Sequence, residues 1–235
     1  MKNYIYCPTT RIKGVGLGVF FFQQSHFRMT SLVRRKVPVM IAIGGMSGSG
    51  KTTLAEELGK KMPGVVVMDS DVVHKKMYGV DPKTPLPDSA YTPENIQTFI
   101  AHIHAEAERL LRSGKSVIVS GSFLDTNSRV NQEALAHKNG GDFIGIYLHA
   151  SASVLFDRVS KRKDSASDAD KKVLRRQITQ NQPKAFRQLN WHLINADQPM
   201  ESIVHTAMFH IHQKNERNAY RLALPKTKRN QTPKP

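Results

Sequence analysis

The sequence predicts an α/β fold, with a parallel sheet of buried strands flanked by helices. One observation is the stretch GMSGSGKT at 45–52, which fits G-x-x-x-x-G-K-[ST], the phosphate-binding loop of P-loop NTPases. A short apolar run at 37–43 precedes this loop, and helix-forming residues follow it at 53–59. The other observation is that apolar runs and helical patterns continue to alternate along the chain, which is typical of βα units.

The loop carries the residue types that a polyphosphate requires. Glycines at 45, 48 and 50 let the backbone N–H groups turn inward, and the N-terminus of the following helix adds a partial positive charge. Lys51 is expected to reach the β- and γ-phosphates, and the Thr52 hydroxyl to ligate Mg²⁺. A glycine-rich turn without nucleotide is the alternative, which the complete motif and its flanks disfavour.

Composition bounds the classes of protein that the chain can represent. With 235 residues and 39% hydrophobic content, the chain is most simply one domain with a sizeable core. Its one cysteine excludes an internal disulfide framework and favours a reducing compartment. The formal net charge of +16 could attract nucleic acid, an anionic membrane or a charged nucleotide and substrate, but many of the basic residues lie near the termini.

The chain divides into three expected parts. Residues 1–36 are expected to form a disordered or non-core leader, since their apolar patch at 15–22 is too short to span a bilayer and no small-residue cleavage site follows it. An organelle-targeting segment and a start at Met29 stay open as alternatives. Residues 37–213 form the predicted P-loop kinase domain, and residues 214–235 a basic tail. We expect a cytoplasmic protein without a membrane anchor, and the oligomeric state stays open.

Two carboxylates follow the second predicted strand at 64–69. Ligands of open parallel sheets bind at the carboxyl ends of the strands, so Asp69 and Asp71 are expected beside the phosphate loop. One carboxylate, assigned to Asp69, can hold Mg²⁺ through its water shell, and Asp71 can orient or deprotonate an acceptor hydroxyl. The alternative is that both are turn and helix-capping residues.

The middle of the chain continues the alternation. A short helix is expected at 72–77, a proline-punctuated loop at 81–87 and a long helix at 96–111 that Thr92 and Pro93 begin. His102 and His104 on this helix do not share a face and make a poor metal pair. Further elements are predicted as a strand at 115–120, a helix at 128–138 and a strand at 143–148.

The strand at 115–120 ends in Ser120, where many phosphate-loop proteins have an aspartate that binds the Mg²⁺ water shell. A serine supplies no charge there. Either Asp69 carries the metal role, or activity is weakened.

A lid is expected after the strand at 143–148. Arg158 and Arg162 are four residues apart on one helix face and lead into the polar segment 164–170. An arginine in such a lid can close over the transferring phosphoryl group, exclude water and offset developing charge. Arg162 lies nearest the loop and is assigned this role, while a solvated helix face is the alternative.

Together, the stretches GMSGSGKTTLA, DSDVVHKKMYGV, AYTPE, GKSVIVSGSFL, DFIGIYLHA, RVSKRKDSASDAD and WHLINA resemble an AAA_33-type P-loop kinase domain. Such domains are often fused to aminoglycoside-phosphotransferase-like modules. The sequence is similar, more distantly, to gluconate and shikimate kinases and to polynucleotide 5′-kinases. The resemblance covers roughly residues 38–197 and implies a five-stranded parallel sheet ordered 2-3-1-4-5 with a mobile lid.

The resemblance also implies the cofactors, ATP and Mg²⁺, and the site. Asp71 would contact or activate the acceptor, Arg129 would contact substrate, Arg158 and Asn195 would lie by the nucleotide, and Arg162 would be the lid arginine. The ATP-binding segment would be Gly45, Met46, Ser47, Gly48, Ser49, Gly50, Lys51, Thr52 and Thr53.

Three hypotheses for function remain at this point. The first is a kinase that phosphorylates a hydroxyl of a small, sugar- or polyol-like molecule. The second is a nucleic-acid 5′-hydroxyl kinase, which the net charge supports. The third is an ATP-binding switch that hydrolyses weakly, which the serine at position 120 motivates. We rank them in that order, because a proline-rich loop, Asp71 and a lid suit a compact hydroxylated acceptor, although one fold serves many acceptors.

Overall fold

The computed structural model describes residues 37–162, 166–180 and 189–223, with the side chains of the last helix described to residue 214. The leader expected at 1–36 and the end of the chain beyond residue 223 lie outside the described residues. Residues 163–165 within the expected lid lie outside them too.

The centre of the fold is a parallel sheet of five strands in the order β2-β3-β1-β4-β5. This confirms the predicted sheet and its strand order. The strands are β1 (Val39–Gly45), β2 (Val66–Asp69), β3 (Val117–Ser120), β4 (Asp142–His149) and β5 (Trp191–Asn195). Every residue of β1 is buried, because it lies at the middle of the sheet with helices on both faces.

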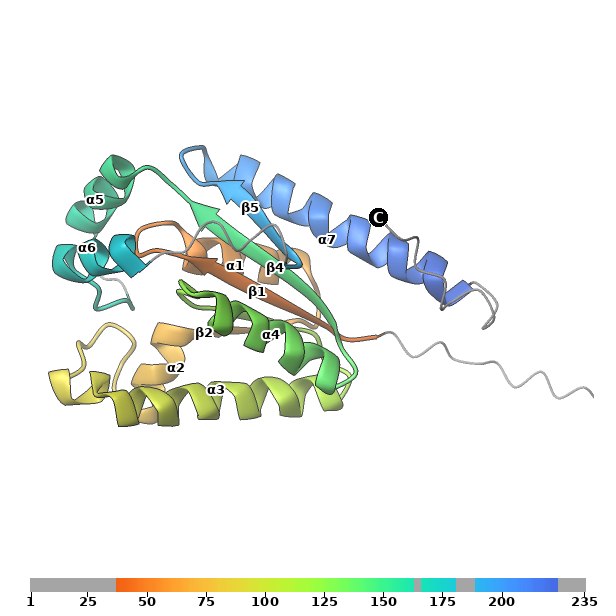
Figure 1. Cartoon of the computed structure of the whole chain (residues 1–235), viewed down its shortest axis with the longest axis horizontal. Helices are drawn as coiled ribbons and strands as arrows, with labels where there is room; N and C mark the ends of the chain where they lie inside the picture. The colour runs from red at the N-terminus through yellow and green to blue at the C-terminus, as the bar shows by residue number, and fades with distance from the viewer. Residues whose placement is uncertain (1–36, 163–165, 181–188, 224–235) are drawn as a thin grey trace, which may run out of the picture. The chain divides into compact units, whose positions relative to one another are not determined.

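Helices cover both faces of the sheet (Figure 1). On one face, α1 (Lys51–Lys61) and α7 (Met200–Ala223) pack their apolar residues on the strands, and on the other α3 (Pro93–Arg112) and α4 (Thr126–Lys138) do so. The helices α2 (Ser70–Met77), α5 (Ala152–Lys161) and α6 (Lys171–Gln180) gather toward the carboxyl ends of the strands. A short 3₁₀ helix, η1 (Asp88–Tyr91), precedes α3.

The long helix α3 begins where the sequence predicts. The Thr92 side chain accepts a hydrogen bond from the Asn95 N–H at 3.3 Å, and Pro93 occupies the first helical turn. Its buried residues, Ile103, Ala107, Leu110 and Leu111, recur at helical spacing and face the sheet. The other face of α3 carries charged residues toward solvent.

Two helices differ from the sequence-based expectation. Residues 171–180 form helix α6, whereas the sequence analysis assigned no element there; Leu174 anchors it by packing with Met46 and Leu155. The apolar residues at 203–212 predict a closing helix, but the helix runs from Met200 to Ala223, because the polar residues after His212 include good helix formers.

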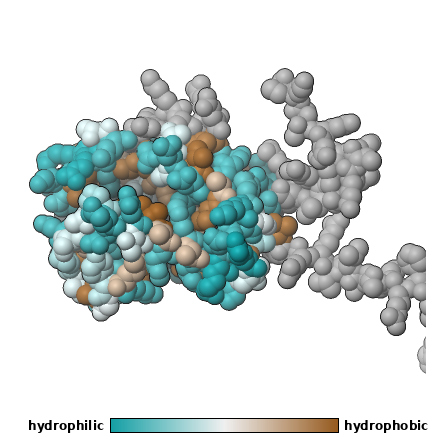
Figure 2. Space-filling view, turned by 60° about the horizontal axis from the view of Figure 1, so that its bottom comes forward, coloured by the Kyte–Doolittle hydropathy of each residue, from teal (hydrophilic) through white to brown (hydrophobic). Residues whose placement is uncertain are grey.

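Among the described residues, no helix is both long and apolar enough to cross a bilayer. Figure 2 shows one face of the molecule, on which apolar residues form separate patches within a mostly hydrophilic surface.

Candidate active site

The phosphate loop connects β1 to α1, and glycine is required at two of its positions. Gly48 has a φ of 83°, and a Cβ there would lie 3.0 Å from the Leu155 carbonyl oxygen of α5. Gly50, with a φ of 95°, is the N-cap residue of α1. The loop therefore delivers its backbone to the N-terminus of α1, where an anion is favoured.

Lys51 begins α1 and turns back over the loop. Its Nζ donates a hydrogen bond to the Met46 carbonyl oxygen at 3.1 Å. Burial lowers the pKa of Lys51, although the charges of Asp71 and Asp69 act in the opposite direction. The charges of Asp69 and Asp71 therefore lie close enough to Lys51 to act on it. This agrees with the expectation that carboxylates at the end of the second strand lie beside the phosphate loop.

Asp69 joins the loop to the sheet edge. Its Oδ2 accepts hydrogen bonds from the Thr52 hydroxyl at 2.8 Å and from the Ser120 hydroxyl at 2.7 Å. Its Oδ1 accepts from the backbone N–H groups of Asp71 and Val72 and caps α2. Asp69 is thus both a helix cap and the carboxylate nearest Thr52, so the two interpretations of this residue are compatible.

Thr52 and Asp69 fit a magnesium site. Mg²⁺ in such sites takes one or two protein oxygens and completes its shell with water and substrate phosphates. Ser120 pairs with Asp69 across β3 and β2 and donates to it, so a neutral hydroxyl stands where a second carboxylate would repel Asp69. Within the described ranges, no three His, Cys, Asp or Glu side chains converge as a metal cluster.

Asp71 lies one residue into α2, between the phosphate loop and the cavity described below. Burial raises its pKa, and the charge of Asp69 raises it further, while Lys51 acts against both. A carboxylate with a raised pKa is a stronger base and is better suited to take a proton from a hydroxyl.

The two arginines of α5 lie at different places. Arg158 donates through Nη2 to the Ala196 carbonyl oxygen at 2.8 Å and through Nη1 to the Gly48 carbonyl oxygen at 3.4 Å, so it joins the loop to the end of β5. Arg162 follows α5 as its C-cap in an extended conformation, so it does not share a helix face with Arg158 as the spacing predicted, and its positive charge acts on Lys51. Its Nη1 is buried without a hydrogen-bond partner among the described residues, which is costly unless an anion arrives there.

The resemblance implied that Asn195 lies by the nucleotide and that Arg129 contacts substrate, and both residues bind backbone groups of the protein. Asn195 ends β5 beside the Arg158 contact, and its Oδ1 accepts from the Asp197 N–H at 2.9 Å. Arg129 is fully buried, donates to the Phe123 and Leu124 carbonyl oxygens and lies 5.0 Å from the centre of the Tyr147 ring. Arg129 is not among the residues that line the cavity described below, and its guanidinium holds the 121–125 loop. Its contact with substrate stays a prediction.

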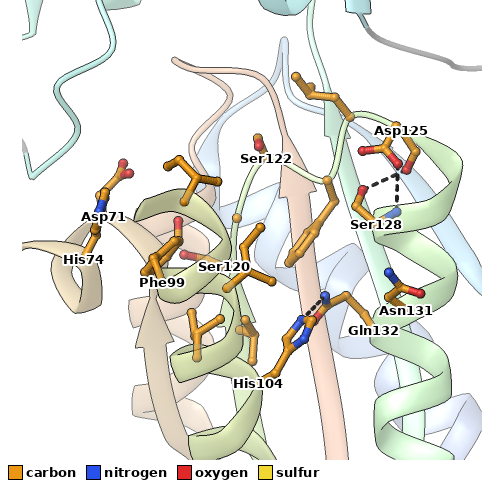
Figure 3. A pocket seen from close by; sticks show the side chains of 18 of the residues that line it. Asp71, His74, Phe99, His104, Ser120, Ser122, Asp125, Ser128, Asn131 and Gln132 are labelled. Atoms are coloured by element: carbon orange, nitrogen blue, oxygen red, sulfur yellow. Dashed lines mark hydrogen bonds between the residues drawn. The ribbon is translucent and has the colours of Figure 1, made fainter. Parts of the chain in front are cut away.

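A cavity of about 870 Å³ opens from Asp71 (Figure 3). Apolar residues of α3 and Phe123 line part of its wall, and α4 supplies Ser128, Asn131 and Gln132. At its far end the Gln132 amide pairs with His104 Nε2 at 3.0 Å. Burial lowers the pKa of His104, which keeps this ring neutral at pH 7.

Several contacts near the site were not found from the sequence. Gln177 of α6 accepts the Ser47 N–H of the phosphate loop at 2.8 Å. Asp168 accepts from Lys75 Nζ at 2.7 Å, from the Tyr91 hydroxyl at 2.6 Å and from the Leu86 N–H at 3.0 Å. Asp168 therefore fastens the expected lid segment to α2, η1 and the proline-rich loop. The partners lie far apart in sequence, and no local pattern reveals them.

Known proteins provide an independent comparison. An uncharacterized protein of Mycobacterium tuberculosis (strain ATCC 25618 / H37Rv) is 29% identical over 176 residues, which cover 72% of this chain and 34% of the relative. The chain thus spans about a third of the length of this relative. A probable adenylyl-sulfate kinase of Pyrococcus abyssi (strain GE5 / Orsay) is 30% identical over 125 residues, covering 52% of this chain and 65% of that protein.

Solved structures agree in fold. A gluconokinase from Sinorhizobium meliloti 1021 superimposes with a TM-score of 0.59 at 24% sequence identity, covering 80% of this chain and 99% of the gluconokinase. A family model described as an AAA domain, AAA_33, matches residues 40–183, which is more than half of the chain. The family match and the fold agree: the chain belongs to the AAA_33 family of AAA domains and has the fold of a P-loop kinase.

Proposed function

We propose that the protein transfers the γ-phosphoryl group of ATP to a hydroxyl group of a small molecule, with residues 37–213 as the kinase domain. One observation carries the proposal: the phosphate loop with Lys51 and the large cavity meet at Asp71. A donor site and an acceptor site that share one carboxylate are the arrangement that a phosphotransferase needs.

Bound ATP with Mg²⁺ supplies the transferable phosphoryl group and charge neutralisation between its phosphates. Backbone N–H groups of residues 45–53 and the Lys51 ammonium would bind the phosphates, and Thr52 with Asp69 would hold the metal's ligand shell. Asp71 would accept the proton of the acceptor hydroxyl while the oxygen of that hydroxyl forms a bond to the γ-phosphorus. The bond from that phosphorus to the bridging oxygen breaks, and ADP leaves.

The arginines are assigned by their positions. Arg162 would reach the γ-phosphate, because its buried Nη1 is open to an anion beside Lys51. Arg158 and Asn195 would border the nucleotide base, since the Arg158 guanidinium links the loop to the chain after β5. Arg129 would act on substrate indirectly, by holding the 121–125 loop that lines the cavity.

Two observations favour a small acceptor. The cavity is of a size that holds a single small molecule, and the related proteins are named for kinases of small acceptors, a gluconokinase and an adenylyl-sulfate kinase. A nucleic-acid 5′-hydroxyl kinase stays the alternative, together with an ATP-binding switch.

The test is transfer of labelled γ-phosphate from ATP, with Mg²⁺, into sugars, polyols, aminoglycosides and a 5′-hydroxyl oligonucleotide. Lys51→Ala is the blank, and Lys61→Ala, at the exposed end of the same helix, is the matched control. We expect label in one small-molecule class, retained in Lys61→Ala and lost in Lys51→Ala. Label in the oligonucleotide alone would favour the alternative, and ATP binding without any labelled acceptor would favour the switch.

A further inference from the structure

The acceptor cavity has a chemical character that the proposed function does not specify. Apolar side chains make up much of its walls: Ile96, Phe99, Ile100 and Ile103 from α3, Val119 from β3, and Phe123. Two of them, Phe99 and Phe123, are aromatic and can contact the faces of a ring. A cavity lined in this way gains free energy from a ligand with an apolar body, not from a fully hydrated one.

The charged side chains at the cavity also favour an uncharged ligand. Of the side chains described as lining it, the formally charged ones are two carboxylates, Asp71 and Asp125. Burial acts to raise the pKa of Asp125, but hydrogen bonds from Ser128 outweigh it and hold that pKa below its ordinary value, so Asp125 is an anion at pH 7. Burial lowers the pKa of His74 and of His104, which leaves both rings neutral. Lys51 offsets the charge of Asp71, so an anionic group entering the cavity would meet repulsion mainly from Asp125.

Neutral polar groups are concentrated on one helix face. Ser128, Asn131 and Gln132 are spaced three and four residues apart on α4, so they point from the same side into the cavity (Figure 3). In this view they lie across the cavity from Asp71. A ligand held between the two walls could present one hydroxyl to Asp71 and hydrogen-bond at its other end to hydroxyl or amide groups.

Size separates ring compounds from small sugars. The cavity volume of about 870 Å³ lies toward the upper end of the range of ligand pockets, which runs from about 300 to 1,000 Å³. A single sugar ring would leave much of this space to water and would place hydrated hydroxyls against isoleucine and phenylalanine side chains.

From these observations, and resting on the proposed function, we propose that the acceptor is an uncharged, ring-containing alcohol larger than a monosaccharide. Its apolar ring body lies between α3 and Phe123, one hydroxyl faces Asp71 and its far end faces α4. Carboxylated or phosphorylated acceptors are disfavoured by the Asp71 and Asp125 carboxylates.

The test measures binding separately from transfer. Isothermal titration calorimetry, with ADP and Mg²⁺ present, compares three matched pairs built on benzene, naphthalene and biphenyl. In each pair one compound carries two hydroxymethyl groups, and the other carries one hydroxymethyl group and one carboxylate. We expect the diol to bind at least about tenfold more tightly than its carboxylate, and the two-ring diols to bind more tightly than the one-ring diol or glucose.

A charge-reversal variant checks where the ligand lies. Asn131 is exposed at the cavity wall, so Asn131→Arg should leave the fold intact while it brings a cation to the far end. We expect Asn131→Arg to remove or invert the preference for the diol, and the matched variant Asn131→Gln to keep it. A preference that is the same in both variants would mean that the ligand does not reach α4.

The outcomes separate the two proposals. Diols that bind with the expected preference, but receive no phosphate from ATP, would overturn the kinase proposal for these compounds and leave the cavity's ligand class standing. Equal or tighter binding of the carboxylates, tighter binding of glucose, or no binding of any ring compound would overturn the ligand class. Faster phosphorylation of the carboxylates would do the same while supporting a kinase.

Discussion

The donor side and the acceptor side of Asp71 are built in opposite ways. On the donor side, one contiguous loop at 45–53 brings its own backbone and Lys51, and a few separate side chains, Asp69 first among them, are added to it. On the acceptor side, the cavity is assembled from α2, η1, α3, the 121–125 loop, α4 and the end of α6. The first depends on backbone conformation, whereas the second depends on side chains that meet through the tertiary fold.

The two sides also differ in charge. Lys51, Arg158 and Arg162 gather around the loop, which suits a polyphosphate, while carboxylates and neutral polar groups line the cavity. This difference shows how one fold keeps its donor and changes its acceptor: the loop constrains a few adjacent residues, and the cavity can vary at many separate positions. Changes on the donor side should therefore lower transfer to every acceptor alike.

The largest expected effect lies where the two sides meet. Asp71→Asn should lower kcat by about 10³-fold, because an amide cannot accept the hydroxyl proton. In the unchanged protein, kcat/KM should fall as the pH is lowered through the Asp71 pKa, which burial and Asp69 place above 3.8. The pH profile of both proteins is the measurement.

Asp88→Asn, on the exposed η1, is the matched control and should keep the acidic limb. An acidic limb that persists unchanged in Asp71→Asn would contradict the assignment of Asp71 as the proton acceptor.

A donor-side change has the next largest effect. Asp69→Asn keeps one oxygen to cap α2, but its NH2 group then faces the Thr52 and Ser120 hydroxyls and cannot accept their hydrogens. The substitution also removes the negative charge that attracts Mg²⁺. We expect kcat to fall about 10²-fold with every acceptor and the Mg²⁺ requirement to rise. Titration of activity with Mg²⁺ measures both.

Ser120→Ala serves as its control. It removes one hydrogen bond to Asp69 and no charge, so we expect a loss of threefold to tenfold at most, on the order of 1 kcal/mol. A loss in Ser120→Ala as large as in Asp69→Asn would mean that the serine, not the aspartate, controls the metal.

The acceptor side depends on a long-range ion pair for its stability. Lys75 is 1% exposed and contacts Asp168, which is 17% exposed, so Asp168→Asn leaves a buried ammonium without its counter-charge. We expect a loss of about 3 kcal/mol in the free energy of unfolding. Urea denaturation measures it, and Asp170→Asn, at an exposed position in the same segment, should cost far less.

The same pair predicts a pH dependence with a defined sign. Burial acts to raise the Asp168 pKa, but hydrogen bonds from Leu86, Lys75 and Tyr91 outweigh it and hold that pKa below 3.8 in the folded protein. A depressed folded pKa contributes stability above pH 3.8, and this contribution is lost as the pH falls through the folded pKa. Asp168→Asn should therefore flatten the acid limb of stability against pH.

The difference between the two sides also explains what the sequence could predict. The loop, the first four strands and Asp69 with Asp71 follow from adjacent residues, so local patterns locate them. No local pattern predicted β5 (Trp191–Asn195), and a fifth strand came only with the family resemblance. The sheet order came with the family resemblance and is confirmed. Helix α6 was missed because its apolar stripe, carried by Val173, Leu174 and Ile178, is short and lies among polar and basic residues.

Side chains that meet through the fold leave no such pattern. His104 lines the cavity together with Gln132, which is 28 positions later in the sequence and pairs with its ring. Lys75 and Asp168 are 93 positions apart, and each alone resembles a solvated charge. Arg129 has the charge expected of a substrate contact, but carbonyl groups of the 121–125 loop bind it instead.

The smallest expected effect concerns a contact from α6 to the phosphate loop. The Gln177 side chain accepts the Ser47 N–H, so a phosphate that binds this N–H must displace it. Gln177→Ala should then tighten ATP binding about threefold to fivefold, since one neutral hydrogen bond contributes about 1 kcal/mol. Gln180→Ala, three residues along the same helix, is the control. Weaker ATP binding in Gln177→Ala would mean instead that Gln177 turns to the nucleotide, and that the donor side, like the acceptor side, recruits distant side chains.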